Sequence, residues 1–295
     1  MKKRKKISNF LSRLITGVVY VALILFGIFT DSVAILGVVF FGFTAIACYE
    51  FQTITRTNNY TLILKILHSL MAGLIFYTVY TSVSATTDYR DTVIALLPYI
   101  SYWLYYLIGE MYRNRPDPIR EVSFAFFSHL YIAIPMALLM LLCVDHYLVF
   151  DVNGTPIRMT HTFWLLPIFT FVWLNDTGAY TVGSLIGKRP LWPRISPKKT
   201  VEGAVGGVLA AVLGAFVFHH FFGFVTTLPN WIMLALLVSV FATWGDLFES
   251  YIKRACGVKD SGNILPGHGG ILDRIDSLLI AAIPAYIFIN IIINV

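Results

Sequence analysis

Charged residues are scarce in this chain of 295 residues, at 13% of the sequence, against about 25% in an average soluble domain. Cysteine is scarce too, and Cys48, Cys143 and Cys256 show no C-x-x-C or related spacing. This argues against a disulfide framework and against a zinc site. The sequence also lacks internal repeats, low-complexity tracts and long polar segments. We therefore expect no separate soluble domain, so any active site must be built from helices and short loops.

Patterns of several enzyme classes are absent as well. Segment 183–188, GSLIGK, has three residues between its glycines where a P-loop requires four, and no Ser or Thr follows the lysine. It therefore does not predict a P-loop. Serine hydrolase and zinc protease motifs are not found either.

Apolar residues are abundant instead: they make up 57% of the chain, and the mean hydropathy is +0.74. They gather in runs of about 20 residues, the length of helix that crosses a bilayer core of ~30 Å. The sequence predicts an all-α polytopic integral membrane protein with about nine transmembrane helices. The nine runs lie near residues 12–30, 33–49, 63–82, 92–112, 122–144, 161–183, 203–224, 231–248 and 271–293.

The first run follows a basic segment, so a secretory signal peptide has to be considered. No small-residue cleavage pattern ends the run, and another apolar run follows directly. We therefore interpret it as a retained first helix.

The distribution of Lys and Arg predicts the orientation, because short cytoplasmic loops are enriched in both. With nine spans and a cytoplasmic N-terminus, 20 of the 22 basic residues fall on the cytoplasmic side. Only Arg90 and Arg158 fall on the other side. We therefore predict a protein of the cytoplasmic (inner) membrane with a cytoplasmic N-terminus.

Polar residues divide the chain into two regions. Residues 1–160 contain about five spans with few ionisable groups, whereas residues 161–295 contain about four spans interrupted by polar residues. We interpret the first region as a membrane-embedded wall and the second as the catalytic region, with motif-bearing loops on the cytoplasmic side.

Two acidic helix faces are expected in the second region. In GDLFESYIKR, Asp246, Glu249, Ser250 and Lys253 recur at helical spacing, which places them on one face. In the next helix, Asp273 and Asp276 stand one turn apart, and the segment between the helices is rich in glycine and turn residues. A compact loop would bring the two faces together.

Carboxylates without a histidine or cysteine cage are typical of magnesium sites, in which substrate phosphates complete the coordination. The surrounding loops supply many cations, which suit a polyanion such as a nucleoside triphosphate. Structural ion pairing with Lys253 or Arg274 is the alternative interpretation of the acidic residues. The neighbouring basic residues are Lys188, Arg189, Arg194, Lys198, Lys199, Lys253, Arg254, Lys259 and Arg274.

Residues 250–276, SYIKRACGVKDSGNILPGHGGILDRID, resemble the signature of the phosphatidate cytidylyltransferase family. Two earlier segments are also similar to motifs of that family: WLNDTGAY at 173–180 and ISPKKTVEGAVGG at 195–207. The resemblance covers the C-terminal half in motif detail, whereas the N-terminal half agrees only in having several spans.

The resemblance implies transfer of CMP from CTP to phosphatidate, giving CDP-diacylglycerol and pyrophosphate on the cytoplasmic side. It also implies Mg²⁺ with a second, monovalent cation, and a homodimer; we expect no nucleic-acid partner. Our hypothesis is that Asp176, Asp246 and Asp273 bind metal. The hypothesis assigns catalysis to Asp246, Lys253, Asp273, Arg274 and Asp276, and substrate binding to Asn175, Asp176, Ser196, Lys198, Lys199, Glu202, Ser250, Lys259, Asp260, His268, Gly269 and Gly270.

Two rival functions remain open from the residues alone. A CTP-dependent polyprenol or lipid kinase would transfer the γ-phosphate and release CDP. An ion-coupled transporter could also use intramembrane carboxylates, although transporter sites tend to lie at the bilayer midplane between repeats, and these charges are expected near the cytoplasmic helix ends.

Overall fold

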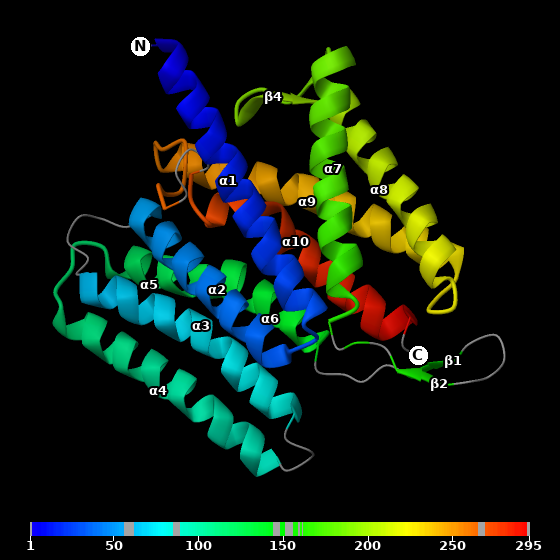
Figure 1. Cartoon of the computed structure of the whole chain (residues 1–295). Helices are drawn as coiled ribbons and strands as arrows, with labels where there is room; N and C mark the ends of the chain where they lie inside the picture. Colours follow the sequence, from blue (N-terminus) through cyan, green and yellow to red (C-terminus); the bar gives the residue numbers. More distant parts are fainter. Residues whose placement is uncertain are drawn as a thin grey trace. The chain divides into compact units, whose positions relative to one another are not determined.

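The structure is a computed structural model of the chain (Figure 1). It describes residues 2–55, 62–84, 89–143, 148–150, 156–158, 160, 162–264 and 269–293. The chain divides into two compact units. The first contains Met1–Val144 and Asp260–Arg274, and the second contains Asp145–Lys259 and Ile275–Val295.

The first unit is a bundle of helices in which α2 packs on α3, and α3 packs on α4 (Figure 1). Its buried aromatic cluster includes Tyr102, Trp103 and Tyr106 of α4. The helices are α1 (Lys2–Phe29), α2 (Val33–Thr55), α3 (Leu62–Ser84), α4 (Tyr89–Tyr112), α5 (Pro118–Ser128), the π-helical turn η1 (His129–Ala133) and α6 (Ile134–Leu141).

The second unit contains three long helices and two short hairpins. Helix α8 packs along α7 and also contacts α9 (Figure 1). Helix α10 begins in the first unit and continues in the second. The elements are β1 (Leu148–Phe150), β2 (Pro156–Arg158), α7 (Leu165–Ile186), β3 (Pro190–Trp192), β4 (Ser196–Thr200), α8 (Val201–Phe222), α9 (Leu228–Ala255), α10 (Leu272–Phe288) and η2 (Ile289–Ile293).

Helices occupy all nine predicted ranges within the described residues, so the mainly helical fold is confirmed. Six of them are long and apolar enough to cross a membrane. On their described residues, α1, α3 and α7 do not meet that criterion, so the count of nine spans is not confirmed. The six helical segments are Val33–Thr55, Val93–Tyr112, Pro118–Leu141, Val201–Phe222, Leu228–Ala255 and Leu272–Ile293.

The two antiparallel hairpins were not predicted. In the second, Pro190 pairs with Thr200 and Trp192 with Ser196, and the register is irregular between these pairs. Its strands contain Pro190 and Pro197. Proline is unfavourable within most strands but is tolerated at sheet edges and irregularities. Because both strands contain proline, the sequence pattern did not predict this hairpin.

Candidate functional site

A cavity of about 460 Å³ lies within the second unit, lined by α7, the β3–β4 hairpin, the start of α8 and α9. Its volume falls in the range of about 300–1,000 Å³ that small-molecule sites occupy. The cavity brings together residues of three predicted motifs that are up to 71 positions apart in sequence, from residue 175 to residue 246. The predicted site residues that line it are Asn175, Asp176, Lys198, Lys199 and Asp246.

One wall of the cavity depends on the close approach of α7 and α8. A Cβ atom added at Gly207 would lie 2.6 Å from the backbone oxygen of Asn175, and one added at Gly178 would lie 2.7 Å from Cβ of Ala210. Only glycine therefore allows this spacing, as in other membrane helix pairs that pack through small residues. Thr200 begins α8 by accepting a hydrogen bond of 3.1 Å from the N–H of Gly203, a typical N-cap.

Lys199 and Asp246 form an ion pair across the cavity wall, between β4 and α9. Their side chains are 28% and 31% exposed, so both groups can still be reached from the cavity. Lys198, the preceding residue, is exposed and lines the same cavity. A ligand anion would therefore meet two lysines, whereas a cation would meet the carboxylate of Asp246.

Asn175 connects α7 with α9 inside this unit. Its amide nitrogen donates a 3.3 Å hydrogen bond to Oγ1 of Thr243, whose hydroxyl donates to the backbone oxygen of Ser239. Only 2% of Asn175 is exposed. Its buried Oδ1 accepts no hydrogen bond from the described residues. An unpaired buried amide oxygen is costly, and such an oxygen is also a ligand that Mg²⁺ or a monovalent cation accepts.

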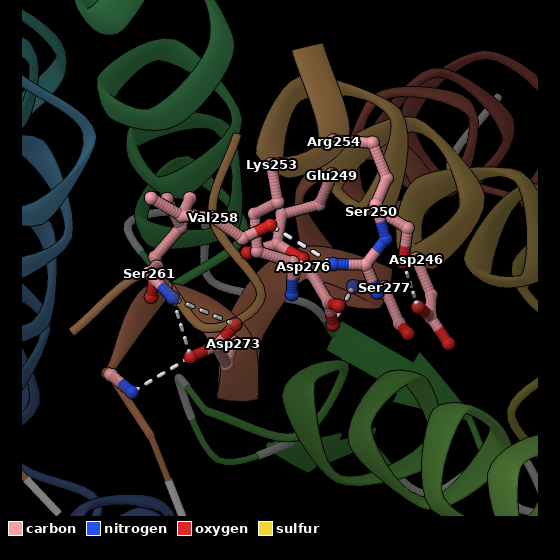
Figure 2. A network of polar contacts seen from close by, with 12 residues as sticks. Asp246, Glu249, Ser250, Lys253, Arg254, Val258, Ser261, Asp273, Asp276 and Ser277 are labelled. Atoms are coloured by element: carbon pink, nitrogen blue, oxygen red, sulfur yellow. Dashed lines mark hydrogen bonds and ion pairs between the residues drawn. The ribbon is translucent and has the colours of Figure 1, made fainter. Parts of the chain in front are cut away.

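The predicted polar face of α9 is confirmed. Figure 2 shows Asp246, Glu249, Ser250 and Lys253 on this helix. The ammonium group of Lys253 pairs with Glu249, and the hydroxyl of Ser250 lies 3.4 Å from Oδ1 of Asp246. Glu249 and Lys253 are buried, so this pair lies beneath the surface instead of lining the cavity.

Asp276 of α10 belongs to the same unit and is 8% exposed. It lies within electrostatic reach of Asp176, Asp246 and Glu249, and of the cation Lys253. Its Oδ1 accepts a 2.6 Å hydrogen bond from the N–H of Ser277 (Figure 2). Three helices thus contribute carboxylates to one region of negative charge. Even so, no three His, Cys, Asp or Glu side chains in the described part of the chain are close enough to hold a metal ion as placed.

Asp273 lies in the first unit, where its carboxylate holds the loop before α10 (Figure 2). Oδ2 accepts hydrogen bonds from the N–H groups of Ser261, at 3.0 Å, and Gly270, at 2.7 Å. The predicted pairing of Asp273 with Asp246, which belongs to the second unit, stays a prediction.

The other predicted residues that the structure describes between α9 and α10, and Arg274 at the start of α10, do not line the cavity. Lys259, Asp260 and Arg274 are exposed, while Gly269 has the positive φ of 81° that glycine adopts readily. Gly270 is buried. His268 lies outside the described residues.

Ser196 belongs to the β3–β4 hairpin and Glu202 to the first turn of α8, and neither residue lines the cavity. The carboxylate of Glu202 accepts hydrogen bonds of 3.1 Å from the N–H groups of Lys188 and Arg189, and one of 3.0 Å from Nε of Arg189. Ser196 is the first residue of β4. Both residues therefore help to shape the segment that carries Lys198 and Lys199.

The family profile described as "Cytidylyltransferase family" matches residues 11–292 of the chain. The chain belongs to the cytidylyltransferase family. It is similar to proteins named phosphatidate cytidylyltransferase from Staphylococcus saprophyticus (52% identity over 116 residues), Staphylococcus haemolyticus (49% over 116) and Staphylococcus aureus strain COL (50% over 118). Each match covers 39% of this chain and 45% of the relative. The chain therefore spans a little under half the length of the curated relatives it matches.

Two kinds of residue near the predicted motifs of this cytidylyltransferase-family chain were not predicted. Tyr180, Ser184 and Thr243 line the cavity. Tyr180 and Ser184 follow Asp176 at helical spacing on α7, a pattern that could have identified them. Glu50 of α2 contacts the signature loop, by which we mean residues 260–271, through Ser261 and Ile271. An acidic residue directly after the apolar run 33–49 was the available signal.

Proposed function

We propose that this protein transfers CMP from CTP to phosphatidate, giving CDP-diacylglycerol and pyrophosphate. The observation that carries the proposal is the cavity in which Asp176, Lys198, Lys199 and Asp246 meet. It combines cations for phosphate with hard oxygen ligands for a metal. The names of the relatives and the family membership support the same reaction.

In the proposed reaction, an oxygen of the phosphatidate phosphate attacks the α-phosphorus of CTP. A new P–O bond forms, the bond between the α-phosphorus and its bridging oxygen breaks, and pyrophosphate leaves with that electron pair. The second pKa of a phosphomonoester is about 6, so phosphatidate is largely dianionic at neutral pH and needs no general base. Positioning and charge neutralisation are then the main tasks.

Lys198 and Lys199 would bind the triphosphate and stabilise the departing pyrophosphate, with Lys253 and Arg274 as further candidates. In this proposal, release of Lys199 from Asp246 accompanies nucleotide binding, because a triphosphate offers the ammonium group a more negative partner. The backbone of Gly269 and Gly270, the hydroxyl groups of Ser196 and Ser250, and the residues Glu202, Lys259, Asp260 and His268 remain proposed contacts.

The donor set suits Mg²⁺: carboxylates and an unpaired amide oxygen, without thiolates. Asp176 and Asp246, which share the cavity, would hold the ion. Asp273 is proposed as a further ligand, Asp276 as support, and Oδ1 of Asn175 as a ligand of the second, monovalent cation. The bound metal would supply positive charge where the phosphates react.

An apolar groove of about 310 Å³ adjoins the cavity and is our proposed site for an acyl chain of phosphatidate. Groove and cavity share Leu191, Ala204 and Thr243. The groove lies along α8 and α9, two helices that are apolar enough to cross a membrane. A lipid phosphate could then reach the cavity while its chains stay in an apolar environment. The other lining residues are Trp192, Val205, Val208, Leu209, Val240, Trp244 and Leu247.

The finer membrane topology also belongs to this proposal. We propose nine spans, a cytoplasmic N-terminus, an active site at the cytoplasmic face of the inner membrane, and a homodimer. Residues 161–295 would contain the catalytic machinery and residues 1–160 a supporting wall. The basic residues of the β3–β4 hairpin support the orientation, because cytoplasmic loops are rich in lysine and arginine.

Two isotopic labels test the reaction. Purified protein would be given phosphatidate, Mg²⁺ and CTP labelled at either the α- or the γ-phosphorus. We expect α-label in the lipid and γ-label in pyrophosphate, in equal amounts. Transfer of the γ-label to lipid with release of CDP would instead establish a lipid kinase, and absence of any lipid product would refute both readings. Uptake of an ion without turnover would favour the transporter.

A further inference from the structure

Glu50 is a buried carboxylate in the first region of the chain, residues 1–160, whose predicted spans contain few ionisable groups. It lies in α2, a helix apolar enough to cross a membrane, and only 3% of the residue is exposed. A charged group in such a place is costly unless hydrogen bonds compensate for its lost hydration. The partners of Glu50 therefore indicate why an acidic residue stands here.

Three of its hydrogen bonds come from the segment that resembles the family signature, more than 200 positions away in sequence. Oε2 accepts bonds from the N–H of Leu272, at 2.9 Å, and from the hydroxyl of Ser261, at 3.2 Å. Oε1 accepts a bond of 3.1 Å from the N–H of Ile271. All these residues belong to the first unit.

Two of the donors lie at the start of α10. The first N–H groups of a helix have no partner within the helix, and a negative charge there interacts favourably with the helix dipole. Glu50 thus serves as an N-terminal cap of α10, supplied by a different helix. The second residue of α10 is Asp273.

Asp273 also holds the same loop. This carboxylate accepts hydrogen bonds from the N–H groups of Ser261 and Gly270. Ser261 therefore donates through its hydroxyl to Glu50 and through its backbone to Asp273. The position of Asp273 is consequently linked to that of Glu50.

Two glycines allow the carboxylate of Glu50 to approach the loop. A Cβ atom at Gly262 would collide with Glu50, whose Oε1, Cδ and Cγ are its three nearest neighbours. A Cβ at Gly270 would collide with Oε2 of Glu50 and with Oγ of Ser261. The loop is therefore shaped around this side chain.

We infer that Glu50 is a positioning residue of the transfer site: it fixes the signature loop and the first turn of α10, and through them Asp273. The expected effect of Glu50 on catalysis rests on the proposed function. Its effect on the position of the loop can be measured without any assay of turnover.

The experiment compares Glu50→Gln and Glu50→Ala with Glu110→Gln. Glu110 is the matched control because it is also a buried glutamate of the first unit, 4% exposed, but it pairs with Arg113 and Arg115 of its own region. We expect Glu50→Ala to lower kcat/KM for CTP at least tenfold, and Glu50→Gln, which keeps one acceptor oxygen, to lower it less. Glu110→Gln should lower thermal stability but leave kcat/KM within about twofold.

A double-substitution cycle provides the sharper test. Gly262→Ala alone should lower kcat/KM at least fivefold, because the new methyl group meets Glu50. In the Glu50→Ala background, the same change should cost less than twofold, since the obstructing side chain is gone. Additive losses would overturn the inference, because they would show that Gly262 and Glu50 act independently.

Limited proteolysis separates this inference from the proposed function. Trypsin cleavage after Lys259, next to the loop, should become at least threefold faster in Glu50→Ala and stay at the wild-type rate in Glu110→Gln. Wild-type cleavage together with wild-type activity in Glu50→Ala would refute the positioning role. Wild-type protein that makes no lipid product, but shows the expected change in cleavage, would refute the proposed reaction and leave the positioning of the loop intact.

Discussion

The ammonium group of Lys199 is paired with the carboxylate of Asp246, although 47 positions separate them in the sequence. The pair joins β4 to α9 at the wall of the cavity. It places a group that we propose to bind phosphate next to a group that we propose to bind metal. The negative charge of Asp246 therefore weakens the attraction of Lys199 for an anion, and the positive charge of Lys199 weakens the attraction of Asp246 for a cation.

Replacing Asp246 with Asn should lower kcat by at least 100-fold, because the amide removes a charged oxygen ligand while keeping the shape of the side chain. Steady-state kinetics with CTP and phosphatidate measures this effect. Asp117→Asn is the control: Asp117 caps α5 in the first unit, and Asn also caps helices well. Near-normal turnover by the Asp246 variant would exclude it as a metal ligand.

Asp176→Asn should raise the Mg²⁺ concentration that gives half-maximal activity by at least fivefold. The physical reason is that the cavity loses one of two carboxylates that could hold the ion. Chelation with EDTA should abolish activity in wild-type protein, and added Mg²⁺ should restore it. An unchanged Mg²⁺ dependence in the variant would mean that Asp176 does not bind the metal.

Asp273→Asn separates the proposed role of Asp273 as a metal ligand from its role as the hydrogen-bond acceptor that holds the loop before α10. Both short hydrogen bonds reach the same oxygen, Oδ2, from Ser261 and Gly270. The amide oxygen of Asn could keep these bonds, whereas the negative charge is lost. We expect turnover to be abolished while trypsin cleavage after Lys259 stays at the wild-type rate. Faster cleavage or retained turnover would each contradict this assignment.

Gly207→Ala should destabilise the second unit, because its methyl group would meet backbone and side-chain atoms of Asn175 on α7. Overpacking of this kind costs about 1–3 kcal/mol, so the midpoint of thermal unfolding should fall. Gly42→Ala in α2 is the matched control, since a Cβ there meets nothing within 4 Å. That change should be neutral or slightly stabilising.

Val208→Trp should raise KM for long-chain phosphatidate at least fivefold by filling the apolar groove, and leave KM for CTP unchanged. A short-chain phosphatidate should be affected less, because it occupies less of the groove. Leu213→Trp is the control: Leu213 lies on the same helix, is 66% exposed and does not line the groove. Equal effects of the two changes would reject the groove as an acyl-chain site.

Several features were predictable because they depend on local pattern alone. Apolar runs of helical length predicted helices in all nine ranges, and periodicity predicted the shared face of Asp246, Glu249 and Ser250. The β3–β4 hairpin was not predictable, because its strands are short and contain proline. The number of spans also depends on helices such as α7, in which Asn175 and Asp176 interrupt the apolar run.

Local sequence patterns were sufficient to predict a mainly helical, strongly apolar chain whose polar motifs resemble those of one enzyme family. Hydrophobic periodicity and motif spacing are properties of neighbouring residues, so they can be read without a fold. The three-dimensional structure was needed to show that Asn175, Lys199 and Asp246 share one cavity. It was also needed to show that Glu50 caps α10. Both results depend on contacts between residues far apart in the chain, and such contacts arise from helix packing that no local pattern specifies.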